Sequence, residues 1–240
     1  MAERACPAAA NPQPPPFCQR LIGMARYAAA VAVVAVALAV TVRAQEPDAR
    51  QIARERKDAE AEAPKLVDVL ALKPGMTVAD VGAGGGAMTV VLGTWIGSGR
   101  VFATDVTQDA LRSTREYVTK EGLTNVTVIE GAQAATNLPD ACCDAVFLRN
   151  VFHHVTDPVP FNKSLYASLK PGGRLAIIDF PPGKGSKLFP GVPANRGGHG
   201  IPVPVVVDEM QAAGFTHLRT IDNWPDGDTK INVFLTLFRK

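Results

Sequence analysis

A cluster of glycines lies between a short apolar segment and a longer one. Residues 77–81 predict a buried strand, residues 87–96 predict an apolar helix, and the turn between them holds Gly82, Gly84 and Gly86. Glycine lets the backbone approach a ligand where any Cβ would clash. A helix N-terminus adds free N–H groups and the positive end of a dipole. The segment therefore predicts a binding site for a ligand that lies close to the main chain.

Two acidic residues restrict the kind of ligand. Gly82, Gly84 and Ala87 also fit the G-x-G-x-x-G/A pattern of nicotinamide dinucleotide sites. Asp80, at the end of the first strand, would repel a pyrophosphate, but it could receive an ammonium group or organise the loop. Asp105 ends the next predicted strand, where an acid accepts the hydroxyls of a ribose. An ammonium acceptor and a ribose acceptor without a phosphate pocket indicate S-adenosylmethionine.

Over residues 66–238 the chain resembles the class I S-adenosylmethionine-dependent methyltransferases, and among them the small-molecule, methyltransferase type 11-like group. The resemblance depends on six blocks that recur in the family's order and spacing. The blocks are Asp80-x-Gly82-x-Gly84-x-Gly86, Thr104-Asp105 with Ala110-Leu111, Leu138-Pro139-Asp140 with Cys143-Asp144-Ala145-Val146, Asn150-Val151-Phe152-His153-His154-Val155, Leu169-Lys170-Pro171-Gly172-Gly173-Arg174-Leu175, and Ala212-Ala213-Gly214-Phe215.

This resemblance implies an α/β fold with a Rossmann-like, doubly wound sheet of seven strands, mostly parallel and ending in a C-terminal antiparallel hairpin. It implies an enzyme that transfers a methyl group from S-adenosylmethionine to a small-molecule acceptor by direct displacement. The residues it assigns to cofactor binding are Asp80, Gly82, Gly84, Gly86, Asp105 and Asn150. One position departs from the family. Many relatives hold the adenine amino group with an acid after the third strand, whereas here Gly131 is followed by Ala132.

Four further residues are candidates for contact with the methyl acceptor. His153 and His154 follow the fourth predicted strand, Asp179 ends the fifth, and His199 lies on a Pro- and Gly-rich loop that should cover the site. Packing or solvent contact is the alternative for each of them. We assign no catalytic residue, because the sulfonium cofactor is already activated and alignment of the reactants is the main task. A general base is needed only if the acceptor arrives protonated.

Cys142 and Cys143 are the only cysteines outside the N-terminal 44 residues. A disulfide between neighbouring residues is strained, and the alternative is two small residues at a turn into a strand. Because no third cysteine is at hand to bind a metal with them, we assign no metal site from the sequence.

The predicted elements explain how these residues come together. Strands at 77–81, 101–105, 126–130, 144–148 and 175–180 alternate with helices of ten to fifteen residues, which predicts a parallel, doubly wound sheet. A charged helix is expected at 48–62 and a second helix from Pro64. A helix at 205–213 precedes two strands, 216–221 and 231–238, whose short connection requires antiparallel pairing.

The N-terminal segment holds the excess positive charge. The 240 residues carry a net charge of +2, and residues 1–44 contain four arginines and one glutamate. The remainder is nearly neutral and only 6% of residues are aromatic, so we expect no nucleic-acid partner. We expect residues 1–23 to be disordered, 24–44 to be a signal peptide or membrane anchor, 45–63 to form a helix and 64–240 to form the methyltransferase domain.

The location of the protein depends on this segment. Residues 28–42 form an uncharged apolar run after Arg26, and Val42-Arg43-Ala44 resembles a signal-peptidase site. Cleavage would give a periplasmic or secreted protein. An uncleaved anchor, the alternative, would be the only membrane contact and would leave a cytoplasmic body. Export also keeps open a non-catalytic relative that binds the cofactor, and a nicotinamide-dependent oxidoreductase is a third alternative.

Overall fold

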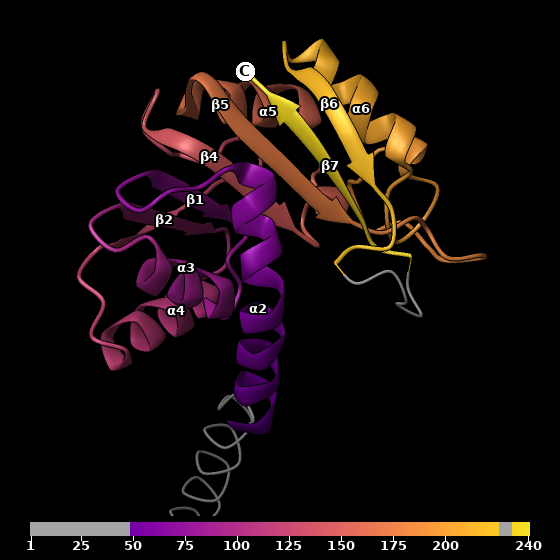
Figure 1. The fold of residues 1–240 in the computed structure, drawn as a ribbon. Coiled ribbons are helices and arrows are strands. Elements are labelled where there is room, and N and C mark those ends of the chain that lie inside the picture. Colours follow the sequence, from indigo (N-terminus) through magenta and orange to yellow (C-terminus); the bar gives the residue numbers. More distant parts are fainter. Residues whose placement is uncertain (1–48, 226–231) are drawn as a thin grey trace, which may run out of the picture. The chain divides into compact units, whose positions relative to one another are not determined.

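The computed structural model describes residues 49–225 and 232–240, and in them a single seven-stranded sheet lies between two layers of helices (Figure 1). The strand order is β3-β2-β1-β4-β5-β7-β6. The strands are β1 (Thr77–Val81), β2 (Arg100–Asp105), β3 (Val126–Glu130), β4 (Cys143–Arg149), β5 (Leu169–Asp179), β6 (Thr216–Ile221) and β7 (Phe234–Arg239). The first five strands are parallel, and β7 pairs antiparallel with both β5 and β6. The expected fold class is therefore confirmed.

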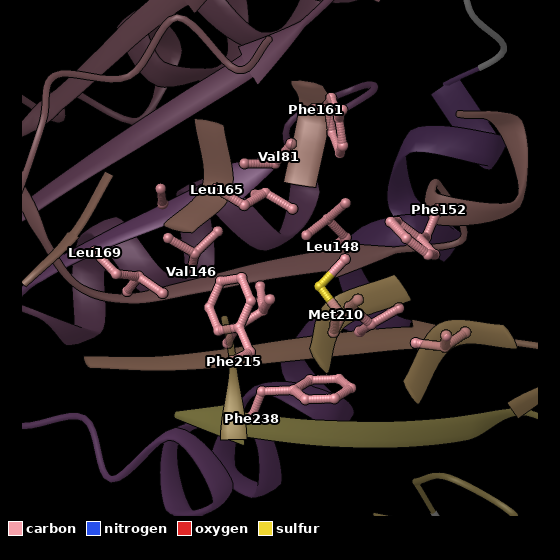
Figure 2. Close-up of a cluster of buried hydrophobic side chains, with 14 of the residues drawn as sticks. Val81, Val146, Leu148, Phe152, Phe161, Leu165, Leu169, Met210, Phe215 and Phe238 are labelled. Carbon is pink, nitrogen blue, oxygen red and sulfur yellow. The ribbon is translucent and has the colours of Figure 1, made fainter. Parts of the chain in front are cut away.

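The helices divide between the two faces of the sheet. They are α2 (Ala49–Leu70), α3 (Ala87–Trp95), α4 (Gln108–Lys120), α5 (Pro158–Ser168) and α6 (Val203–Ala212), with short 3-10 turns η1 (Phe152–His154) and η2 (Ala194–Arg196). Successive strand residues point to opposite faces, so the sheet contributes to two apolar clusters, one on each face. One cluster joins the sheet to α2 and α3, and the other joins it to α5 and α6. Figure 2 shows the second cluster, in which Val146 and Leu148 of β4 pack with Leu165 of α5 and Met210 of α6.

The strand order reverses between β1 and β4. β2 and β3 lie on one side of β1, whereas β4 and β5 follow on the other. In open α/β sheets, ligands bind outside the carboxyl ends of the strands at such a reversal. Asp80, Asp105 and Asp179 lie at or next to the carboxyl ends of β1, β2 and β5, so the fold brings the acids expected from the sequence to one edge.

Two elements differ from the expectation. The break expected at Pro64 is not present, because α2 continues through it to Leu70. The missing N–H of Pro64 costs one backbone hydrogen bond. The buried face made by Ala59, Ala63 and Leu66 runs across that position and holds the helix together. Strand β5 begins at Leu169 instead of residue 175, since its first residues also pair with β4 across an irregularity between Cys143 and Ala145.

The predictions on residues 1–48 lie outside the described residues. These are the disordered extension, the signal peptide or anchor, and the start of the first helix. None of the helices that the structure describes is long and apolar enough to cross a membrane. Cys142 and Cys143 are both free thiols.

Candidate active site

The glycine turn after β1 adopts the backbone conformation expected from its composition. Gly82, Gly84 and Gly86 have φ angles of +79°, +55° and +81°, a region that side chains rarely adopt. Gly86 precedes α3 with no side-chain cap, so the first N–H groups of this helix have no side-chain acceptor there. The turn is held from outside by Thr114 of α4, whose hydroxyl donates to the carbonyl oxygen of Gly84 at 2.9 Å.

The three glycines differ in what surrounds them. A Cβ on Gly82 would lie 2.3 Å from Val151, and a Cβ on Gly86 would lie 3.0 Å from Thr114. A Cβ on Gly84 would meet nothing within 4 Å. Gly82 and Gly86 are therefore required by the packing of the protein itself. The space beside Gly84 is open to a ligand.

Asp105 connects the turn to the next helix. One carboxylate oxygen, Oδ2, accepts the N–H of Gly84 at 3.0 Å. The other, Oδ1, accepts the N–H of Thr107 at 3.0 Å and its hydroxyl at 3.1 Å. Each carboxylate oxygen has two lone pairs, so Oδ2 keeps acceptor capacity for a ligand hydroxyl. Asp105 orders the glycine turn whether or not a ligand is bound.

Asp80 lies near the carboxyl end of the central strand β1 and is only 3% exposed. The Thr89 hydroxyl donates to its Oδ2 at 2.6 Å. Burial raises the pKa of Asp80 to about 7, while the Thr89 bond and the Arg149 charge oppose that rise. A positively charged group placed beside Asp80 would shift it to the carboxylate form.

Two cavities meet at Gly82. The larger, about 350 Å³, has largely apolar walls, which also include Asp105 and His154. Its wall residues are Val81, Gly82, Thr104, Asp105, Val106, Gly131, Ala132, Gln133, Ala135, Thr136, Val151, His154, Val155, Thr156 and Phe161. The smaller, about 230 Å³, is lined by Asp80, Arg149, Glu55 and the turn from Gly82 to Gly85. A ligand that is apolar at one end and charged at the other fits the pair.

Arg149 is a cavity residue that the sequence did not single out. It ends β4, and its Nε donates to Glu62 Oε2 at 2.7 Å. Glu62 is buried and also accepts the indole N–H of Trp224 at 2.6 Å. Glu62 lies on α2, which the sequence predicted only as a charged helix. The sequence therefore did not indicate that this acid would pair with Arg149. The resulting ion pair fixes a cation across the smaller cavity from Asp80.

Asn150 does not line either cavity, although both of its neighbours do. Its φ is +58°, and its N–H donates to the carbonyl oxygen of Ile178 at 2.8 Å. This left-handed residue turns the chain between Arg149 and Val151, which face the smaller and the larger cavity respectively. A direct contact between Asn150 and the cofactor stays a prediction.

The acceptor candidates lie together, and one of them, His154, lines the larger cavity. His153 is buried, and its Nδ1 lies 2.7 Å from Asp179 Oδ1, while its N–H donates to Asp179 Oδ2 at 3.1 Å. The ring of His153 lies 3.9 Å from that of His154 and 4.9 Å from that of His199, between ring centres. Asp179 and His199, which follow His153 by 26 and 46 positions in the sequence, thus lie next to it in the fold.

Gln133 is a second cavity residue that the sequence did not single out. Ala132 has no polar side chain, as the sequence showed, but Gln133 lines the cavity one position later. Its Oε1 accepts the hydroxyl of Thr156 at 3.4 Å. Gln133 thus places a polar amide on the wall of this cavity.

Comparison with known proteins identifies the fold family. Residues 79–177 match the family of methyltransferase domains. The ubiquinone/menaquinone biosynthesis C-methyltransferase UbiE of Enterobacter sp. (strain 638) is 31% identical over 116 residues, which cover 48% of this chain and 46% of that protein. The chain thus matches about half the length of this curated relative.

Solved structures extend the likeness to nearly all of the described residues. A SAM-dependent methyltransferase from Aquifex aeolicus has a TM-score of 0.62 at 28% identity, over 81% of this chain and 99% of that one. Haemonchus contortus phosphoethanolamine N-methyltransferase 2, solved with S-adenosyl-L-methionine, has a TM-score of 0.59 at 18% identity, over 73% and 51%. Residues 79–177 thus match a methyltransferase domain, and the fold of the chain is similar to that of solved SAM-dependent methyltransferases.

Proposed function

We propose that this protein transfers a methyl group from S-adenosylmethionine to a small-molecule acceptor that reaches the larger cavity beside His154. The observation that carries the proposal is the pair of cavities that meet at Gly82. One is largely apolar with a volume of about 350 Å³, and the other is lined by the buried Asp80 and by the cation Arg149. S-adenosylmethionine has the matching parts, a nucleoside at one end and an amino acid at the other.

The residues of this chain divide the cofactor between them. Asp105 would accept the ribose hydroxyls through its remaining lone pairs, and Gln133 would face the adenine edge. Asp80 would receive the ammonium group, and Arg149 would receive the carboxylate in the manner usual for a guanidinium. Each assignment follows from the charge or the hydrogen-bonding group that the side chain presents to its cavity.

The chemistry requires little of the protein beyond alignment. The bound cofactor supplies an activated methyl group. The chain holds the nucleoside through the β1 and β2 edge, and η1 forms the wall next to the acceptor. Restricting the reactants to one geometry contributes much of the rate in such reactions. The apolar walls made by Val81, Val151 and Phe161 exclude water from the same space.

Calorimetry on the purified full-length chain tests the proposal. We expect one S-adenosylhomocysteine or S-adenosylmethionine per chain and no competition from NAD. Binding of NAD with exclusion of S-adenosylhomocysteine would instead support the oxidoreductase alternative. Tritiated methyl groups from S-adenosylmethionine, followed into candidate acceptors that carry hydroxyl, thiol, amine or activated carbon nucleophiles, would then identify the acceptor class. The name of UbiE makes a carbon nucleophile one of the first to try.

For the location of the protein, we propose that residues 24–44 act as a cleaved export signal. The support is the 15-residue uncharged run at 28–42 and the small residues before Gln45. N-terminal sequencing of the protein from a bacterial host should find Gln45 first. An intact N-terminus on a body that is protected from protease in spheroplasts would support the anchored alternative.

A further inference from the structure

Three histidines meet next to the larger cavity, which one of them, His154, lines. His153 and His154 belong to η1, and His199 belongs to the loop between β5 and α6. One ligand nitrogen from each of them can be chosen so that all three lie within 4.8 Å of one another. Imidazole is the commonest protein ligand for zinc and other first-row metals. We propose that His153, His154 and His199 form a binding site for a divalent transition-metal ion.

His153 is already oriented as a metal ligand. Its Nδ1 lies 2.7 Å from Asp179 Oδ1, so an Nδ1 proton bonded to the carboxylate leaves the Nε2 lone pair available. This Nε2 is buried and has no hydrogen-bond partner. A carboxylate behind a histidine is the usual second partner in metal sites, where it fixes the ring and the tautomer. A metal ion would satisfy the one nitrogen of His153 that the protein leaves unpaired.

Packing around His153 holds the ring in place. Phe152, the preceding residue, is fully buried in the cluster of Figure 2. The guanidinium of Arg196 lies over the Phe152 ring, 5.1 Å from its centre. Asp179 also accepts the N–H groups of His153 and Phe180, at 3.1 and 2.9 Å. The first ligand is therefore rigid.

The other two histidines are exposed and can adjust. The backbone of His199 is held because its N–H donates to the Ser186 hydroxyl at 3.1 Å. The next turn is fixed where Ile201 donates to the carbonyl of Phe180 at 2.8 Å. Zinc–nitrogen bonds of about 2.0–2.1 Å in a tetrahedron place ligand nitrogens about 3.3 Å apart. Side-chain rotation of His154 and His199 would bring them to that distance.

Three protein ligands leave one position for a substrate, as in catalytic zinc sites. On the proposed function, that position would take the hydroxyl or thiol of the methyl acceptor, because His154 lines the cofactor cavity. The ion would lower the pKa of the bound group. The O–H or S–H bond would break, its proton would leave to water, and the heteroatom would keep the electron pair. As the new bond to the methyl carbon forms, the methyl–sulfur bond breaks and its pair stays on the cofactor's sulfur.

The test uses the full-length chain without an affinity tag, freed of metal by a chelator that is then removed. Co²⁺ is titrated and followed by visible absorption, and Zn²⁺ by calorimetry. We expect one ion per chain, with the intense absorption of a tetrahedral nitrogen-bound Co²⁺ and no thiolate charge-transfer band. His199→Ala should weaken binding by about 100-fold or more, since it removes a ligand from an exposed loop. Asp179→Asn should weaken it by about 10–100-fold.

His217 provides the matched control, because it is the only other histidine of the chain and lies on β6. His217→Ala should bind the metal as the parent does. Absence of one-to-one binding, or binding that survives His199→Ala, would overturn the proposal, as would an equal loss in His217→Ala. Binding of S-adenosylhomocysteine is measured on the same samples. A chain that binds this ligand but no Co²⁺ would sink the metal site alone, and the reverse result would sink the proposed function alone.

Discussion

The two parts of the proposed site, a cofactor end around Gly84 and Asp105 and an acceptor end around His153, are built in different ways. At the cofactor end, the site is made mainly by backbone conformation, in one stretch from Asp80 to Gly86 and one acid, Asp105, that is hydrogen-bonded to it. At the acceptor end, it is made by side chains from three separate segments, with His199 carried by a long loop. The first end depends on a short strand–turn–helix unit, and the second depends on the packing of the whole α5 and α6 layer.

This difference explains how substrate range can vary without loss of the cofactor. Loops that carry function on a rigid scaffold tolerate change, and the loop between β5 and α6 contributes nothing to the residues around the glycine turn. Variants at the cofactor end should alter binding of S-adenosylhomocysteine, whereas variants at the acceptor end should not. The predictions below test that separation, in order of decreasing effect on affinity for this ligand.

Gly84→Val should have the largest effect. A β-branched side chain at a φ of +55° is strained, and it would also project from a turn that lines the smaller cavity. We expect calorimetry to find no binding of S-adenosylhomocysteine. The strain should cost about 1–2 kcal/mol of stability. Gly122→Val is the matched control, since its φ is +67° with nothing within 4 Å, and it lies at the end of α4 away from both cavities. Normal binding by Gly84→Val would mean that the turn does not hold the cofactor.

Asp105→Ala should weaken binding at least about tenfold, because hydrogen bonds to a charged group contribute about 1.5–3 kcal/mol each. The variant also removes the acceptor for Gly84 and Thr107 N–H groups, so its melting temperature should fall. Asp105→Asn keeps one oxygen acceptor, so it separates the loss of a ligand contact from the loss of stability. We expect Asp105→Asn to recover most of the stability but only part of the affinity. An unchanged dissociation constant in Asp105→Ala would remove this residue from the site.

The strand, glycine turn and helix around Gly84 could be predicted from the sequence for a physical reason. A strand, three glycines and a helix within about twenty residues are each determined locally, and β3 and β6 also have the predicted bounds. The acceptor end could be predicted only as a set of candidate residues. The loop after β5 has no hydrophobic pattern that predicts the approach of His199 to His153. That approach depends on tertiary packing, such as the contact of Arg196 with Phe152. Arg149 was missed since its partner Glu62 lies on a distant helix.

Asp80 should make cofactor binding depend on pH. Its pKa of about 7 in the unliganded protein means that the carboxylate forms as the pH rises through 7. If the carboxylate receives the ammonium group, affinity should rise about tenfold between about pH 6 and 8, as the ionised fraction rises from about 0.1 to 0.9. Asp80→Asn should bind weakly with little of this dependence. A parent profile that matches that of Asp80→Asn would mean that Asp80 only supports the loop.

The same shift has a consequence for folding. The native state holds the Asp80 proton more tightly than the unfolded chain, in which the pKa of this side chain is 3.8. Linkage then lowers the stability of the unliganded protein as the pH rises from about 4 to 7. Asp80→Asn should remove that part of the slope in denaturant unfolding, and a saturating concentration of S-adenosylhomocysteine should offset it in the parent.

Arg196→Met should have the smallest effect on binding and leave the affinity for S-adenosylhomocysteine within about twofold. It should destabilise the loop between β5 and α6, which carries His199. Arg196 is fully buried, its Nη1 lies 2.7 Å from Glu209 Oε1, and two further nitrogens have no partner. Removing one member of a buried pair destabilises by about 3–5 kcal/mol, whereas replacing both by apolar groups can restore stability. Arg196→Met should therefore speed trypsin cleavage at the exposed Lys184 and Lys187 of the same loop, and Arg196→Met combined with Glu209→Leu should slow it again. If Arg196→Met instead abolished binding of S-adenosylhomocysteine, the two ends of the site would be coupled through Phe152 and η1, and the acceptor loop would be part of the cofactor site.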